Sequence, residues 1–192
     1  MRIASLAVIL LAAAGVPSLR AALFGGMQQP SSQKGGRASM SFTVSSPSFS
    51  SGATIPKAYS CQGADISPAL EWSGHPPPTG GFALIVDDPD APAGTWVHWV
   101  IWNILASTHQ LPENLAKSDR LDNGATQGRN DFGKTGYNGP CPPPGKAHRY
   151  FFRLYALDGK LTLPPGASRQ QLDGAMQGHI LAQAEYLGTF RR

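Results

Sequence analysis

Apolar residues along this chain fall into short runs that are separated by turn-forming residues. A continuous apolar run covers residues 82–86 and ends at an acidic turn that contains two prolines, so a strand is expected there. Further strands are expected at 96–104, at 148–157 and at about 185–190. Runs of this length and spacing are typical of a β-dominated fold.

The segment 96–104 is apolar at nearly every position. Strict alternation assigns one face to five residues: Trp96, His98, Val100, Trp102 and Ile104. It assigns the other face to Val97, Trp99, Ile101 and Asn103. Because both faces are largely apolar, this strand is expected to lie inside a sheet. In the same way, His148, Tyr150, Phe152 and Leu154 share one face of the strand at 148–157.

One helix is expected near the C-terminus, after Pro164-Pro165-Gly166. Ser168 and Gln171 have the spacing of a capping box, in which each residue's side chain bonds the other's backbone. Four apolar residues then follow at helical spacing: Leu172, Ala175, Met176 and Ile180.

Composition supports many turns and argues against nucleic acid as a partner. The chain has 22 Gly and 17 Pro among 192 residues, which favours short strands over long helices. Its net charge of +4 comes from residues 1–37, where Arg2, Arg20, Lys34 and Arg37 occur without any acid. Removing these 4 from 16 basic residues leaves 12, against 12 acids. The remainder is neutral and has no basic stripe interleaved with aromatics.

The N-terminal part has the pattern of a signal peptide. A charged start is followed by an apolar run over 3–16 and by small residues, so we expect a signal peptide at 1–22, a flexible linker at 23–40 and one domain at 41–192. The apolar run is too short for a transmembrane anchor. Export to a secreted or periplasmic location is the first expectation. Import into an organelle such as a plastid, through a two-part presequence, is the alternative.

Cys61 and Cys141 are the two cysteines of the chain, 80 residues apart in sequence. In an oxidising compartment they are a candidate disulfide pair, but two separate buried thiols fit the sequence equally well. No Cys/His spacing typical of a zinc site is present.

Polar residues gather at the ends of the predicted strands, where loops form the mouths of pockets. The turn Asp88-Pro89-Asp90-Ala91-Pro92 follows the strand at 82–86, and His98 interrupts an apolar strand. A loop rich in glycine and proline at 138–145 leads into His148-Arg149-Tyr150. Each feature alone has an ordinary structural explanation. The motifs GxSxG, HExxH, GxGxxG and the phosphate-binding Gly-Lys-Ser/Thr loop are missing.

These three motifs in this order resemble the phosphatidylethanolamine-binding proteins, also called Raf-kinase-inhibitor-like proteins. The segments 66–68, 127–133 and 139–143 resemble the bacterial and archaeal branch, and the similarity extends over about 42–189. The resemblance implies an antiparallel Greek-key β-sandwich with a short helix and one anion pocket. It assigns ligand binding to nine positions: Asp88, Asp90, Pro92, Trp96, His98, Gly139, Pro140, His148 and Tyr150. Val97 stands where mammalian members carry a further histidine.

The expected function is non-enzymatic binding of phosphate or a phosphorylated headgroup, without a cofactor. Protonated histidines, the Tyr150 hydroxyl and backbone N–H groups would donate to the anion, while Asp88 and Asp90 would hold the histidines charged. Binding should then strengthen as the pH falls. Alternatively, an aspartate would meet the ammonium group of a zwitterionic headgroup.

Other classes of function stay open at this point. The resemblance also permits inhibition of a protease or kinase through the protein surface, with no partner identified. A metal site built from His98, His148 and a carboxylate, or a hydrolase that uses the carboxylates as acid and base, is chemically reasonable.

Overall fold

The computed structural model describes residues 41–192, so the expected signal peptide at 1–22 and linker at 23–40 lie outside the described residues. The elements in chain order are β1 (Thr43–Ser45), the 3-10 turn η1 (Lys57–Tyr59), β2 (Leu70–Ser73), β3 (Gly81–Asp88), β4 (Trp96–Leu105), β5 (Gln110–Leu111), β6 (Thr126–Gln127), β7 (His148–Leu157), α1 (Arg169–Met176) and β8 (Ile180–Phe190).

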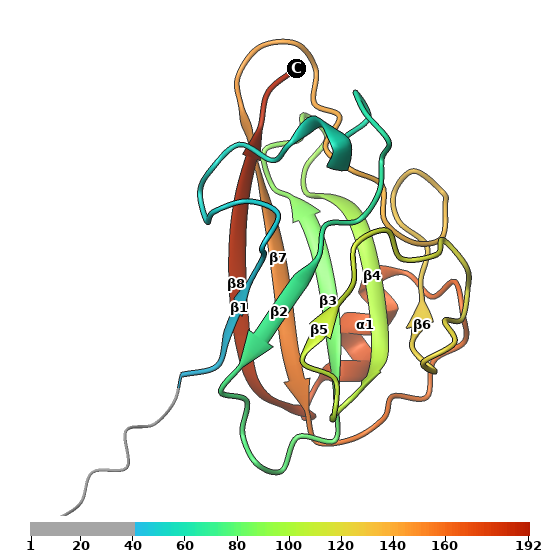
Figure 1. The fold of residues 1–192 in the computed structure, drawn as a ribbon. Helices are drawn as coiled ribbons and strands as arrows, with labels where there is room; N and C mark the ends of the chain where they lie inside the picture. The colour runs from blue at the N-terminus through green and yellow to red at the C-terminus, as the bar shows by residue number, and fades with distance from the viewer. Residues whose placement is uncertain (1–40) are drawn as a thin grey trace, which may run out of the picture. The chain divides into compact units, whose positions relative to one another are not determined.

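The strands form two sheets whose neighbouring strands are all antiparallel. The large sheet has the order β6-β4-β3-β7-β8 and the small sheet the order β1-β2-β5. β7 returns beside β3 although 59 residues separate the end of one from the start of the other. The expected mainly β fold with antiparallel sheets and one short helix is confirmed (Figure 1).

Two apolar layers cover the two faces of the large sheet. One layer lies between the sheets and includes Trp72 of β2, Leu84 of β3 and Phe152 of β7. The other includes Ile85 of β3 and Leu172 of α1. Figure 1 accordingly shows the small sheet on one side of β3 and β4 and α1 on the other. The central strands are therefore buried on both faces, which is why they read as nearly continuous apolar runs.

The strict alternation expected for 96–104 is wrong, because β4 contains two irregularities in its pairing with β3. Val86 pairs with Trp99 while Asp87 pairs with Val97, so His98 is an extra residue, and a second shift occurs near Asn103, whose φ is 57°. Each inserted residue shifts the alternation by one position. As a result Val97, Val100 and Trp102 all lie in the layer beneath α1, whereas Trp99, Ile101 and Ile104 lie between the sheets.

The helix is confirmed, with its capping box, but it is shorter than the apolar spacing predicted. The Ser168 hydroxyl accepts from the backbone N–H of Gln171, and the Gln171 side chain accepts from the backbone N–H of Ser168. The helix ends at Met176, and Ile180 begins β8 by pairing with Leu157. Assigning Ile180 to the helix was wrong because Gly178, with a φ of 81°, turns the chain into a strand that β7 pairs.

Candidate functional site

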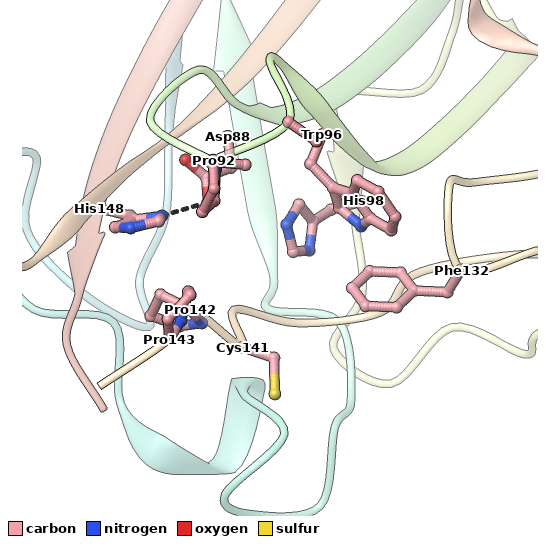
Figure 2. Close-up of a pocket in the computed structure, with 11 residues that line it drawn as sticks. Asp88, Pro92, Trp96, His98, Phe132, Cys141, Pro142, Pro143 and His148 are labelled. Atoms are coloured by element: carbon pink, nitrogen blue, oxygen red, sulfur yellow. Dashed lines mark hydrogen bonds and ion pairs between the residues drawn. The ribbon is translucent and has the colours of Figure 1, made fainter. Parts of the chain in front are cut away.

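A cavity of about 250 Å³ lies where β3 ends and where β4 and β7 begin. Most of its lining is apolar, and its ionisable residues are Asp88, His98 and His148 (Figure 2). The apolar and sulfur-containing lining residues are Ala91, Pro92, Ala93, Trp96, Phe132, Cys141, Pro142 and Pro143. The structure thus brings together five of the nine predicted ligand-binding residues: Asp88, Pro92, Trp96, His98 and His148.

Asp88 and His148 form a buried pair at one wall of the cavity. The Asp88 carboxylate is 2.7 Å from Nδ1 of His148, and its other oxygen accepts from the backbone N–H of Asp90 at 2.8 Å. Both residues are buried. Because Nδ1 is bound to the carboxylate, Nε2 is the nitrogen of His148 that remains for a ligand.

His98 is held differently, by a backbone carbonyl. Its Nδ1 donates to the carbonyl oxygen of Asn138 at 2.7 Å, and its ring contacts Phe132 and Tyr150 edge to face. Burial lowers the pKa of His98, and this outweighs the opposing effects of the Asn138 carbonyl and the Asp88 charge. The ring is therefore neutral near pH 7, and Nε2 is a hydrogen-bond acceptor. The lowered pKa of His98 thus disfavours the charged, donating ring that was expected.

Tyr150 packs against the ring of His98 and is absent from the residues that line the cavity. It is 1% exposed, and its hydroxyl has no hydrogen-bond partner among the described residues. Burial, followed by the charge of Asp88, raises the pKa of Tyr150, so the hydroxyl stays protonated. An unpaired buried hydroxyl costs about 1–3 kcal/mol, which a bound donor or acceptor would offset.

The structure does not bring Asp90 to the cavity. Its two carboxylate oxygens accept from the Arg149 guanidinium at 2.9 and 2.7 Å, and one accepts from the Arg149 backbone N–H at 2.9 Å. The guanidinium hydrogen bond lowers the pKa of Asp90 to about 2. The second aspartate of the motif therefore fastens the turn to β7, and the resemblance could not reveal this because Arg149 lies 59 residues away.

Gly139 and Pro140 also lie outside the lining of the cavity. The Gly139 N–H donates to Asp65 at 2.6 Å, so it is not free for an anion, and the Pro140 carbonyl accepts from the Cys61 N–H at 3.1 Å. A Cβ at position 139 would lie 2.0 Å from the carbonyl oxygen of Tyr59, which only glycine avoids. These residues position the loop at 138–141, and sequence reasoning missed the role of Asp65.

Cys61 and Cys141 are joined in a disulfide with a Cα–Cα distance of 5.4 Å. This decides between the two alternatives that the sequence left open. Cys141 also lines the cavity, although it was not among the nine positions assigned to the ligand.

Phe132 is a lining residue that sequence reasoning missed. This residue is 38% exposed, and its ring meets that of Trp96 edge to face at a centroid distance of 5.5 Å. The Asn130 side chain accepts from the Phe132 N–H at 3.0 Å and donates to the Asn138 side chain at 2.9 Å, which holds the loop against the cavity. The available signal was the segment 127–133, whose single aromatic residue lies among polar residues. Val97, in contrast, is buried beneath α1 rather than at the cavity.

Neither a metal cluster nor a membrane helix is found among residues 41–192. No group of three or more His, Cys, Asp or Glu side chains in this region has a geometry that could hold a metal ion. No helix in the same region combines the length and apolarity needed to cross a bilayer.

Comparison with known proteins gives consistent matches over most of the chain. The family described as phosphatidylethanolamine-binding protein matches residues 45–191. A UPF0098 protein from Methanothermobacter thermautotrophicus is 51% identical over 144 residues, which are 75% of this chain and 95% of that protein. A UPF0098 protein from Aquifex aeolicus is 50% identical over 151 residues, which are 78% of this chain and 88% of that protein.

Two crystal structures resemble this fold. A phosphatidylethanolamine-binding protein homolog from Chlamydia trachomatis, CT736, has a TM-score of 0.73 and 42% identity, covering 80% of this chain and 99% of that one. Escherichia coli YbcL is described as a member of the mammalian family. It has a TM-score of 0.74 and 36% identity, covering 79% of this chain and 98% of that one. The chain belongs to the phosphatidylethanolamine-binding protein family and is of its bacterial and archaeal type.

Proposed function

We propose that this member of the phosphatidylethanolamine-binding protein family binds a phosphate-bearing small molecule in the cavity and does not catalyse a reaction. The observation that carries the proposal is the Asp88–His148 pair, joined at 2.7 Å in the wall of a mainly apolar cavity. Phosphate or a phosphorylated headgroup is the ligand that best fits these groups.

The pair supplies a donor whose charge is compensated within the protein. When His148 is protonated, its Nε2–H donates to a phosphate oxygen while Asp88 balances the charge of the ring. The apolar walls exclude water and so strengthen this charge-assisted hydrogen bond. Binding is therefore expected to strengthen as the pH falls.

His98 adds a requirement on the ligand. Its neutral ring offers Nε2 as an acceptor, because Nδ1 donates to Asn138. A phosphate monoester has a second pKa of about 6, so near neutral pH a fraction of the ligand carries a phosphate hydroxyl that donates to such an acceptor. A ligand with an ammonium or hydroxyl group next to the phosphate meets the same requirement.

The lining favours binding over catalysis. It contains no serine, threonine or lysine, and the sulfur of Cys141 is in a disulfide. The carboxylate of Asp88 is bonded to His148 and to the backbone N–H of Asp90, so the lining offers no free carboxylate as a base. We therefore propose no enzymatic step at this site.

Calorimetric titration of the whole chain tests the proposal, with inorganic phosphate and with phosphorylethanolamine, at about pH 6 and about pH 8. Saturable binding that is stronger at the lower pH and absent in His148→Ala is expected. The matched control is His179→Ala, because His179 forms a similar pair with Asp158, at 2.9 Å, on the exposed surface. Equal binding by both variants, or no binding by the unmodified protein at either pH, would overturn the proposal.

A second candidate is inhibition of a protease or kinase through the surface around the cavity. The exposed ring of Phe132 favours it, since an exposed aromatic residue at the rim of a cavity is suited to anchor a protein partner. Inhibition of a panel of proteases that is lost in Phe132→Ala, without any phosphate binding, would favour this candidate.

We also propose that the protein acts in an oxidising compartment outside the cytoplasm, and the disulfide supports this. N-terminal sequencing of the secreted or periplasmic fraction tests it. Recovery of an uncleaved chain from the cytoplasm alone would contradict it.

A further inference from the structure

One wall of the cavity depends on a loop with few attachments. Residues 136–140 and Pro142 are buried and Cys141 is half-buried, whereas 143–147 are exposed before β7 begins at His148. The start of this loop is bonded to the segment around η1: the Tyr137 hydroxyl donates to the Tyr59 carbonyl at 2.8 Å, and the Cys61 N–H donates to the Pro140 carbonyl at 3.1 Å. From Pro142 to Ala147 no hydrogen bond joins the loop to the rest of residues 41–192.

The disulfide stands at the boundary between the bonded and unbonded parts of this loop. Cys141 is the last residue with an attachment, and the two residues that follow, Pro142 and Pro143, line the cavity with it. In Figure 2 these three residues form the side of the cavity below His148 and His98. Cys61, the partner of Cys141, is exposed, so a reductant in solution can reach the bond.

We propose that the Cys61–Cys141 disulfide is a redox-dependent clamp on this wall, and that its reduction frees residues 141–147 and weakens ligand binding. Reduction breaks the S–S bond with two electrons and two protons from a dithiol, which is itself oxidised to a disulfide, and leaves one thiol on each cysteine. The loop then adopts several conformations, of which one presents Pro142 and Pro143 to the ligand. The apparent Kd is inversely proportional to the population of that conformation, so it rises when the population falls.

The part of this proposal that concerns ligand binding rests on the proposed function, whereas release of the loop does not. Trypsin measures release without any ligand, because Lys146 lies in the exposed part of the loop. Lys160 is an internal control, since it is also exposed but lies outside the loop, between β7 and α1. Cleavage rates at the two sites are compared for the whole chain, oxidised and after treatment with dithiothreitol.

Reduction should raise the cleavage rate at Lys146 on the order of tenfold, because a proteolytic site must open locally before it is cut, and leave cleavage at Lys160 within about twofold. The Cys61→Ala/Cys141→Ser double variant should behave like the reduced protein in either buffer. Equal acceleration at both lysines means that the bond stabilises the whole fold, which overturns the proposal. Unchanged cleavage at Lys146 overturns it as well.

Calorimetry with inorganic phosphate, and separately with phosphorylethanolamine, measures the effect on the ligand. The Kd should rise at least roughly fivefold on reduction and recover on reoxidation, as expected when the competent conformation becomes a minority. An unchanged Kd beside faster cleavage at Lys146 would overturn the link between the clamp and the ligand. No binding even by the oxidised protein, beside faster cleavage at Lys146, would refute the proposed function and support the release of the loop.

Discussion

Asp87 and Asp88 are neighbours in β3, and both are nearly fully buried, yet their surroundings differ. Asp87 faces α1, where its carboxylate meets the Arg169 guanidinium at 2.6 Å and the Arg153 guanidinium at 3.2 Å. Asp88 faces the cavity, where its charged partner is His148. Successive side chains of a strand point to opposite faces, which accounts for the separation of the two carboxylates.

The difference between the two partners separates a structural ion pair from a binding group. Arginine is charged at every ordinary pH, so Asp87 is always compensated and has nothing to offer a ligand. His148 can exist with or without a second proton, and its Nε2 remains for a ligand because Nδ1 is bound to Asp88. Two identical neighbouring residues therefore differ in function because of what the tertiary structure places opposite each one.

Replacing Asp87 should have the largest effect, and that effect is on stability. In Asp87→Asn two guanidinium groups lose their buried counter-charge, so the free energy of unfolding should fall by about 2–4 kcal/mol. Urea unfolding measures this. Asp158→Asn is the control. The pair of Asp158 with His179 is exposed, so its loss should cost less than about 1 kcal/mol. Equal costs would show that burial of Asp87 does not matter.

Replacing Asp88 should lower the affinity for phosphate strongly and the stability only slightly. In Asp88→Asn the hydrogen bond to His148 becomes a neutral one, so stability should fall by only about 1 kcal/mol. The affinity for phosphate should fall roughly tenfold or more, because protonated His148 loses its compensating charge. Calorimetry beside urea unfolding separates the two effects. A large stability loss with unchanged affinity would place Asp88 in the same structural class as Asp87.

Tyr150→Phe should change affinity while leaving stability nearly intact. The hydroxyl has no partner among the described residues, so its removal should leave the free energy of unfolding unchanged within about 0.5 kcal/mol or raise it slightly. If a ligand satisfies the hydroxyl, the affinity for phosphate should fall by about threefold to tenfold. A stability loss above about 1 kcal/mol would instead mean that the hydroxyl is bonded within the protein.

The smallest expected effect is a pH dependence of stability that comes from His98. Because its pKa is lowered in the folded protein, the unfolded chain takes up a proton at a higher pH than the folded chain does. Stability should therefore fall as the pH drops below the unfolded value of about 6.5. Urea unfolding at several pH values, beside His98→Gln, measures this contribution. An identical pH dependence in the variant would rule it out.

The central strands and the helix cap were predictable because their signals are local. β7 was predicted with its observed bounds, since apolar alternation and the preceding glycine and proline loop mark both ends. The capping box of Ser168 and Gln171 depends on residues three positions apart, and it was also predicted. Within the site, three motifs at strand ends brought Asp88, His98 and His148 together, because strand ends that meet at one edge of a sheet bring their loops together.

Only the tertiary structure decided the faces of β4 and the role of Asp90. The faces of β4 depend on bulges, which arise from how the strand pairs with β3 and leave no clear period in the sequence. The role of Asp90 depends on Arg149, which the fold brings near from another strand.

The sequence by itself determined the residue types at the cavity, the turns that present them and the apolar runs that bury them. The tertiary structure decided which of these groups are charged, paired or free. The neutrality of His98 follows from its burial, and the bond between Cys61 and Cys141 follows from a Cα–Cα distance of 5.4 Å. Burial and distance arise from contacts between residues that are far apart in the chain, so local patterns carry no record of them.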